Sequence, residues 1–179
     1  KKIQQRLLKA IPGGAHTYSR GYDQFPSNVP EVLQKGKGAY VYDNNGNKYL
    51  DYGMALRAVN IGYSEKAIDD AAIKQIKLGN NLTRPSNIEL EAAELLIKEI
   101  DSVDMVKFTK NGSTAVSAAA KLARSYTGRE IIARCTQHPF FSYDDWFIGS
   151  TNIKKGIPKR IQNLTKCFDY NNISSLKKL

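Results

Sequence analysis

A run of small polar residues marks the point where a predicted strand gives way to a predicted helix. It consists of Asn111, Gly112, Ser113 and Thr114, within the stretch MVKFTKNGSTAVSAAAKLARSYTGR. The start of a helix offers unpaired backbone N–H groups and a partial positive charge, and both favour phosphate. Gly112 lets a ligand approach the backbone, and the hydroxyls add donors. These residues therefore predict a phosphate site, with ordinary helix capping as the alternative.

The sequence gives less support to other kinds of site. The segment has neither the Gly-Lys-Ser/Thr of a Walker loop at the required spacing nor a G-x-G-x-x-G pattern. His16 and His138 stand far apart, so we expect no metal site. Cys135 and Cys167 do not make a disulfide framework, which favours a reducing, cytoplasmic location.

The length and composition suit one globular domain. The chain has 179 residues, of which 41% are hydrophobic, enough to form a core. It contains no run of about 18 apolar residues, so we expect no membrane-spanning helix. The basic N-terminus lacks both the apolar core of a secretory signal and an initiator Met, which suggests that the natural chain begins earlier.

The net charge of +10 lies mostly in the second part of the chain. Residues 1–106 hold 14 Lys and Arg against 13 Asp and Glu, which gives +1, whereas residues 107–179 hold 13 against 4, which gives +9. The basic residues are scattered and show no RNA-binding or helix-turn-helix signature, so nucleic acid is not an expected partner. A non-catalytic module that binds an anion or nucleic acid is the alternative from another functional class.

A β-hairpin is predicted near the N-terminus. Residues 40–43 and 48–52 alternate in polarity on either side of NNGN. Asn45-Gly46 favours a type I′ turn, because both residues tolerate the positive φ angles that this turn needs.

Two helices follow the hairpin in the prediction. The first covers residues 64–79, with Ser64 as its cap, and the second covers residues 86–100. Ser86 and Glu89 have the spacing of a capping box at the start of the second helix.

The remainder alternates between strand and helix. A strand at residues 105–109 leads into a helix over 113–126, and a short strand follows at 131–135. One face of that helix carries small and apolar residues, namely Ala115, Ala118, Ala119, Leu122 and Tyr126. The alternation predicts an α/β domain with a largely parallel sheet, whose ligands bind at the carboxyl ends of the strands.

The order of these segments resembles the class III aminotransferases of pyridoxal 5′-phosphate (PLP) fold type I, especially their glutamate-1-semialdehyde aminomutase branch. PGGAHTYSRGY is similar to the substrate-binding segment of that branch, GKGAYVYDNNGNKYLDYG to the family's opening hairpin, and VKFTKNGSTAVSAAAKLARSYTGR to its phosphate cup. The resemblance covers about residues 12–158. It implies an N-terminal segment with a β-hairpin over residues 1–60 and the first part of the large PLP-binding domain over residues 61–179.

The resemblance implies that Asn111, Gly112 and Ser113 bind the phosphate of PLP. They occupy the positions of the family's Ser-Gly-Thr cup, from which Asn111 departs by offering an amide in place of a hydroxyl. Thr114 is a second departure, because the family usually has Glu there.

Two further positions carry implied contacts to cofactor and substrate. A ring that stacks on the pyridine of PLP falls on His138, where the family more often has Tyr or Phe, and Phe140 or Phe141 is the alternative. The Arg that grips a substrate carboxylate in the aminomutase branch falls on Arg20. Without these roles, Arg20 is a surface residue and His138 a turn residue. The branch's active-site Trp falls on Leu56, which implies a differently shaped substrate pocket.

The resemblance also implies that part of the catalytic machinery lies elsewhere. The Lys that forms a Schiff base with PLP and the Asp that pairs with its ring nitrogen follow residue 179 in the family order. No Lys in the chain has a matching context, so we assign no catalytic residue and expect the chain alone to be inactive.

The implied function is PLP-dependent transfer of an amino group from an amine or amino acid to a keto or aldehyde acceptor. The full-length enzyme is expected to be a cytoplasmic homodimer with small-molecule partners and no membrane contact. Glutamate-1-semialdehyde 2,1-aminomutase is the alternative within enzymes, and Leu56 in place of Trp favours the aminotransferase.

Overall fold

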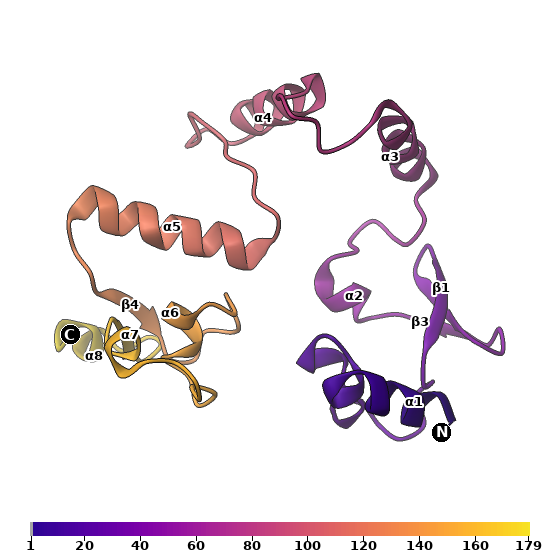
Figure 1. Cartoon of the computed structure of the whole chain (residues 1–179), viewed down its shortest axis with the longest axis horizontal. Coiled ribbons are helices and arrows are strands. Elements are labelled where there is room, and N and C mark those ends of the chain that lie inside the picture. Colours follow the sequence, from indigo (N-terminus) through magenta and orange to yellow (C-terminus); the bar gives the residue numbers. More distant parts are fainter. Residues whose placement is uncertain (1) are drawn as a thin grey trace. The chain divides into compact units, whose positions relative to one another are not determined.

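The computed structural model describes residues 2–179, and these fall into two units. Most of their helices and several of their strands are labelled in Figure 1. The first unit ends at Arg84, and the second runs from Pro85 to Leu179. No helix in the described part of the chain is both long and apolar enough to cross a membrane. The first unit contains α1 (Lys2–Ala10), three 3₁₀ turns η1 (Pro12–Gly14), η2 (Tyr18–Arg20) and η3 (Tyr22–Gln24), β1 (Leu33–Lys37), β2 (Tyr40–Asp43), β3 (Lys48–Leu50), α2 (Met54–Arg57) and α3 (Lys66–Leu78). The second contains α4 (Asn87–Glu99), α5 (Gly112–Thr127), β4 (Ile132–Cys135), α6 (Asp145–Ile148), α7 (Lys159–Gln162), β5 (Thr165–Phe168) and α8 (Ile173–Lys177).

The predicted hairpin is confirmed, but the predicted type I′ turn is wrong. β2 and β3 pair antiparallel, and β1, which the sequence pattern did not indicate, adds a third strand beside β2. Within the turn only Gly46 has a positive φ, of 82°. The Asp43 carboxylate accepts hydrogen bonds from the backbone N–H of Asn45 at 2.8 Å and of Asn47 at 2.9 Å. The side chain of Asp43 therefore selects a three-residue loop with a left-handed glycine instead of the two-residue type I′ turn.

The predicted cap of α3 is also wrong. Glu65 occupies the N-cap position, whereas Ser64 adopts a positive φ of 54° and its hydroxyl donates to the Gly36 carbonyl at 3.0 Å. Ser64 thus ties the start of α3 to β1. Gly79 ends the helix with a φ of 98°, as predicted.

α2 is a left-handed turn, which is rare for residues other than glycine. Met54, Ala55, Leu56 and Arg57 have φ values of 45°, 47°, 60° and 72°. Each residue in a left-handed helix costs roughly 1–2 kcal/mol, because Cβ crowds the following carbonyl. Surrounding contacts must therefore hold this turn.

The second unit confirms the two predicted helices around residues 86–126. Glu89 Oε2 accepts from the Ser86 N–H at 2.6 Å, which is the capping-box contact expected at the start of α4. α5 starts after Asn111 and ends at Gly128, which has the left-handed φ typical of helix ends.

The predicted strand at residues 105–109 is wrong. These residues form no helix or strand and pair with no strand in the described part of the chain, and a strand obtains its hydrogen bonds from a neighbour. The parallel arrangement itself is confirmed by β4 and β5, which pair from Ile132 opposite Thr165 to Cys135 opposite Phe168. Figure 1 shows α6, α7 and α8 around this pair. Together these elements give the mixed α/β architecture that the sequence predicts.

The core of the second unit lies under the N-terminal half of α5. Phe147 is 3% exposed, and Ser142 is fully buried. The covered face of α5 carries Val116, Ser117 and Ala120, whereas the predicted apolar face is solvent-exposed, with Leu122 at 71% and Tyr126 at 90%. The small residues of α5 thus allow a loop to pack closely against the helix.

Candidate functional site

The start of α5 has the donors that a phosphate group needs. Asn111 is the N-cap, and its Oδ1 accepts from the Thr114 N–H at 2.9 Å and from the Thr114 hydroxyl at 3.1 Å. The N–H groups of Gly112 and Ser113 lie in the first turn of α5, where no earlier helical carbonyl can accept from them, and they donate to no other described residue. A Cβ placed on Gly112 would meet nothing within 4 Å, so the backbone is open there. Two free donors and open space therefore lie side by side.

The loop that follows β4 is tied to this helix start. The Tyr143 N–H donates to Ser113 Oγ at 3.3 Å, which leaves the Ser113 hydroxyl hydrogen available to a ligand. One turn further along α5, Ser117 Oγ accepts from Trp146 Nε1 at 2.9 Å and donates to the Asp144 carboxylate. Ser142 Oγ lies 3.3 Å from Ser117 Oγ. Side chains from residues 142–146 thus hold the loop against the helix next to Ser113.

His138 lies at the start of the same loop. Its ring is exposed and stacks on Phe141, with the ring centroids 3.9 Å apart and the planes at 18°. Its Nδ1 lies 2.9 Å from the Pro139 carbonyl, and because a carbonyl only accepts, Nδ1 carries the hydrogen. The structure therefore places the predicted cup residues and the loop that carries His138 within one unit, joined by the contact between Tyr143 and Ser113.

Arg134 secures the base of that loop. Its side chain is almost fully buried, at 8% exposure, and donates to the carbonyls of Cys135 and Ser150, each at 2.8 Å, and to Ser150 Oγ at 2.6 Å. The guanidinium also lies 4.8 Å from the ring centroid of Phe147. These bonds fix the end of β4, from which the loop to His138 leaves.

Arg20 belongs to the first unit. It ends η2, its side chain is exposed, and it forms no ion pair with any residue from 2 to 179. A cavity of about 540 Å³ runs along the segment on both sides of it. The residues that line this cavity are Leu8, Pro12, Gly13, Ala15, Thr17, Tyr18, Gly21, Tyr22 and Asp23. The guanidinium of Arg20 is thus available to a ligand.

Leu56 lies in the left-handed turn, which a carboxylate holds. Asp51 Oδ1 accepts from the Gly53 N–H at 2.9 Å, and Asp51 Oδ2 accepts from the Tyr63 hydroxyl at 2.5 Å. The hydrogen bond from Tyr63 lowers the pKa of Asp51, whereas burial and the Asp51 charge raise the pKa of Tyr63. The positive charge of Arg20 slightly opposes that rise. Sequence patterns do not predict this contact, because Asp51 lies in the predicted hairpin and Tyr63 lies outside every predicted element.

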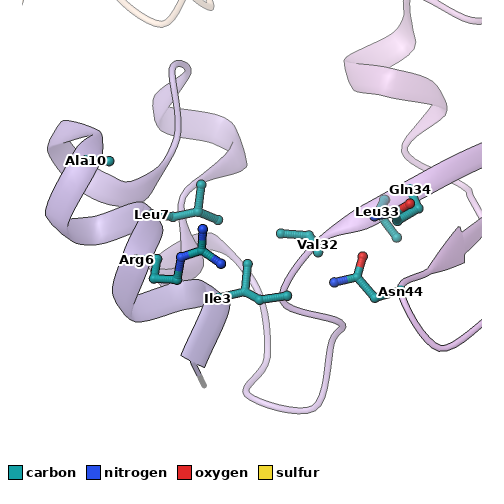
Figure 2. Close-up of a pocket in the computed structure, with 8 residues that line it drawn as sticks. All are labelled: Ile3, Arg6, Leu7, Ala10, Val32, Leu33, Gln34 and Asn44. Carbon is teal, nitrogen blue, oxygen red and sulfur yellow. The ribbon is translucent and has the colours of Figure 1, made fainter.

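A second cavity in the first unit contains none of the predicted site residues. It measures about 470 Å³ and lies between α1 and the β1 strand (Figure 2). Figure 2 shows mainly apolar side chains around it, namely Ile3, Leu7, Ala10, Val32 and Leu33, with Arg6, Gln34 and Asn44 as the polar ones. Arg6 is the only charged residue in this lining, and no carboxylate accompanies it. The cavity therefore lacks an acid–base pair for proton transfer.

Comparisons with known proteins agree with this geometry. The family model described as Aminotransferase class-III matches residues 18–165. The chain is 33% identical to glutamate-1-semialdehyde 2,1-aminomutase of Campylobacter hominis, covering 96% of this chain and 40% of that protein. It is 34% identical to 3-aminobutyryl-CoA aminotransferase of Cloacimonas acidaminovorans, covering 97% and 41%.

A solved structure extends this agreement to the fold. The FumI protein of Sphingopyxis sp. MTA144, in its PLP internal aldimine form, superposes with a TM-score of 0.88 at 30% identity, over 99% of this chain and 42% of that one. The chain thus spans about two fifths of the length of the relatives that it matches.

Proposed function

This chain belongs to the class III aminotransferase family, and we propose that it supplies the phosphate-binding helix and the substrate-binding segment of a PLP-dependent aminotransferase. The reaction is transfer of an amino group from an amine or amino acid to a keto or aldehyde acceptor. The observation that carries the proposal is the start of α5, where two free N–H groups, an open glycine and a serine hydroxyl meet the loop that bears His138.

These residues fit the phosphate end of PLP. The N–H groups of Gly112 and Ser113 and the Ser113 hydroxyl supply three donors to phosphate oxygens, and the helix dipole adds favourable charge. Asn111 contributes by fixing the helix start, because its carbonyl oxygen is used by Thr114. His138 presents a flat ring for the pyridine. When bound, PLP acts as an electron sink that makes the α-proton of the substrate acidic.

Arg20 is proposed to bind a carboxylate group of the substrate. Its side chain is exposed and forms no ion pair within residues 2–179, and its sequence neighbours Tyr18, Gly21 and Tyr22 line the cavity along η1 to η3. Arginine holds a carboxylate through two parallel hydrogen bonds, which fixes orientation as well as position.

The 2,1-aminomutase reaction on glutamate 1-semialdehyde is a second candidate. It is favoured by the likeness to the Campylobacter hominis aminomutase, and Leu56 in place of the branch's Trp speaks against it. An aminomutase must retain its intermediate, because the amine returns to the same carbon skeleton. Full-length protein supplied with glutamate 1-semialdehyde alone, without another donor or acceptor, separates the two. Rapid stoichiometric formation of 5-aminolevulinate identifies the aminomutase, and its absence together with activity on an added donor and acceptor identifies the aminotransferase.

The assembly and location are also proposed. Exposed apolar side chains on α3, α4 and α5 favour a homodimer or burial against further parts of the protein. Cys135 and Cys167 are both free thiols, which suits a reducing cytoplasm. Sedimentation of the full-length protein measures the first point directly.

The test of the proposed function is PLP binding by the full-length protein. We expect a visible absorbance band after removal of free PLP, and borohydride should fix the cofactor to a lysine outside residues 1–179. A borohydride adduct on a lysine within residues 1–179 would overturn the assignment of catalytic residues. Retention of inorganic phosphate without any affinity for PLP would support the anion-binding module instead.

A further inference from the structure

Two aromatic rings, those of Phe141 and Phe147, connect His138 to the core of the second unit. His138 stacks on Phe141 at 3.9 Å, and Phe141 meets Phe147 edge to face, with centroids 6.1 Å apart and planes at 80°. Phe147 is 3% exposed, and the Arg134 guanidinium lies 4.8 Å from its centroid. An exposed imidazole is thus linked to a buried ring through Phe141.

The orientation of the His138 ring depends on two contacts. The hydrogen bond from Nδ1 to the Pro139 carbonyl, at 2.9 Å, holds one edge. The near-parallel stack on Phe141 fixes the plane, because a single hydrogen bond leaves the ring free to rock about it. Phe141 covers one face of the imidazole, and the other face has no ring against it in residues 2–179.

We propose that Phe141 is a positioning residue for the cofactor, which backs the imidazole of His138 so that its free face receives the pyridine ring. This inference rests on the proposed function. It assigns the cofactor contact to His138 and the supporting role to Phe141, and it gives Phe140 neither. Phe140 is 66% exposed, and its one ring contact within residues 2–179 is an edge-to-face contact with Phe147, with the centroids 6.0 Å apart and the planes at 79°.

The energetic consequence follows from the stack. An aromatic pair contributes roughly 0.5–1.5 kcal/mol beyond its buried area. Without Phe141, the imidazole must be ordered when the cofactor binds, so that part of the binding free energy is lost. The loss corresponds to a weakening of PLP affinity by about three- to tenfold.

The experiment compares Phe141→Leu with Phe140→Leu in the full-length protein. PLP dissociation constants are measured by equilibrium titration, and thermal unfolding of each apoprotein checks that it is folded. We expect Phe141→Leu to weaken PLP binding about three- to tenfold, Phe140→Leu to change it less than twofold, and Phe141→Tyr, which keeps the ring, to retain affinity. Equal PLP affinities for Phe141→Leu and Phe140→Leu would overturn the inference while leaving the proposed function intact.

A second measurement reports on the ring stack without cofactor. In the apoprotein, the His138 imidazole protons should show an upfield ring-current shift that Phe141→Leu removes and Phe140→Leu retains, with His138→Gln used for assignment. An unchanged His138 shift in Phe141→Leu would refute the stack itself. If wild-type protein binds no PLP at all, the proposed function fails, and the cofactor role of Phe141 fails with it.

Discussion

The hydroxyl of Tyr63 donates a 2.5 Å hydrogen bond to Oδ2 of Asp51, while the other oxygen of that carboxylate receives the Gly53 N–H at the start of the left-handed turn. One carboxylate therefore connects the end of β3, the turn that contains Leu56 and the segment before α3. The contact explains how four residues with positive φ persist without glycine.

The first prediction concerns pH. The hydrogen bond from Tyr63 lowers the pKa of Asp51 below its usual value near 3.8. The stabilisation that the ionised Asp51 carboxylate provides is therefore present above about pH 4 and is lost as the pH falls through the lowered pKa. Burial and Asp51 raise the pKa of Tyr63 above 10, so the contact is lost again as the pH rises through that value. Hydrogen exchange at residues 53–57, corrected for intrinsic rates, should show protection that Tyr63→Phe reduces by about 1 kcal/mol at pH 7. A Tyr63→Phe effect of the same size at pH 3 would contradict this linkage.

The second prediction reverses the usual effect of glycine. Ala55 has a φ of 47°, so Ala55→Gly removes a left-handed penalty of roughly 1–2 kcal/mol and adds a smaller unfolded-state entropy cost. We expect a net stabilisation of about 0.5–1 kcal/mol in urea unfolding. The matched control is Ala71→Gly, an exposed position within the right-handed helix α3, which should destabilise by about 1 kcal/mol. Loss of stability in both variants would show that the turn carries no such penalty.

The third prediction tests the phosphate site with charge alone. Ser113→Asp places a carboxylate beside the proposed phosphate, where like charges at about 4 Å cost about 4 kcal/mol at an effective dielectric of 20. After screening by solvent, PLP affinity should fall on the order of a hundredfold. Ser113→Asn, of similar size and without charge, should lose far less affinity. If the two variants bind PLP equally well, the phosphate lies elsewhere.

The fourth prediction concerns Arg20. Arg20→Ala should raise KM for a carboxylate-bearing substrate about 30-fold, which corresponds to about 2 kcal/mol, and leave PLP bound. An amine donor without a carboxylate group is the control, and its KM should not change. Steady-state kinetics with both donors provide the measurement. A KM that stays constant for every carboxylate substrate would exclude the proposed role of Arg20.

The elements predicted from sequence are those whose signals are local. Asn111 caps α5 and Glu89 binds the Ser86 N–H through side chains only a few residues away, so the pattern and the structure coincide. A prediction is wrong where the same short segment can form two different local structures. The residues NNGN suit a type I′ turn, but Asp43 offers its carboxylate to two backbone N–H groups and selects another loop.

The remaining features depend on contacts between distant segments. In the sequence, Ser117 is one of many small residues in α5. Its hydrogen bonds with Asp144 and Trp146 form only because the fold places these distant segments side by side. The hydrogen bond between Tyr63 and Asp51 likewise cannot be predicted from the sequence pattern. The apolar run at residues 105–109 looks like a strand, but pairing requires a neighbour that no pattern within the run can specify.

The parallel pairing of β4 with β5 sets an order of events during synthesis on the ribosome. β2 and β3 are neighbours in sequence, so their hairpin can close as soon as residues 48–50 emerge. β4 must wait until α6, α7 and finally β5 have been made, because its partner lies beyond them. Thr165 also donates to the Trp146 carbonyl at 2.6 Å, so the segment that buries Phe147 is secured only then. We therefore expect the nascent second unit to expose its aromatic residues longer than the first, which makes it the part that a chaperone would protect.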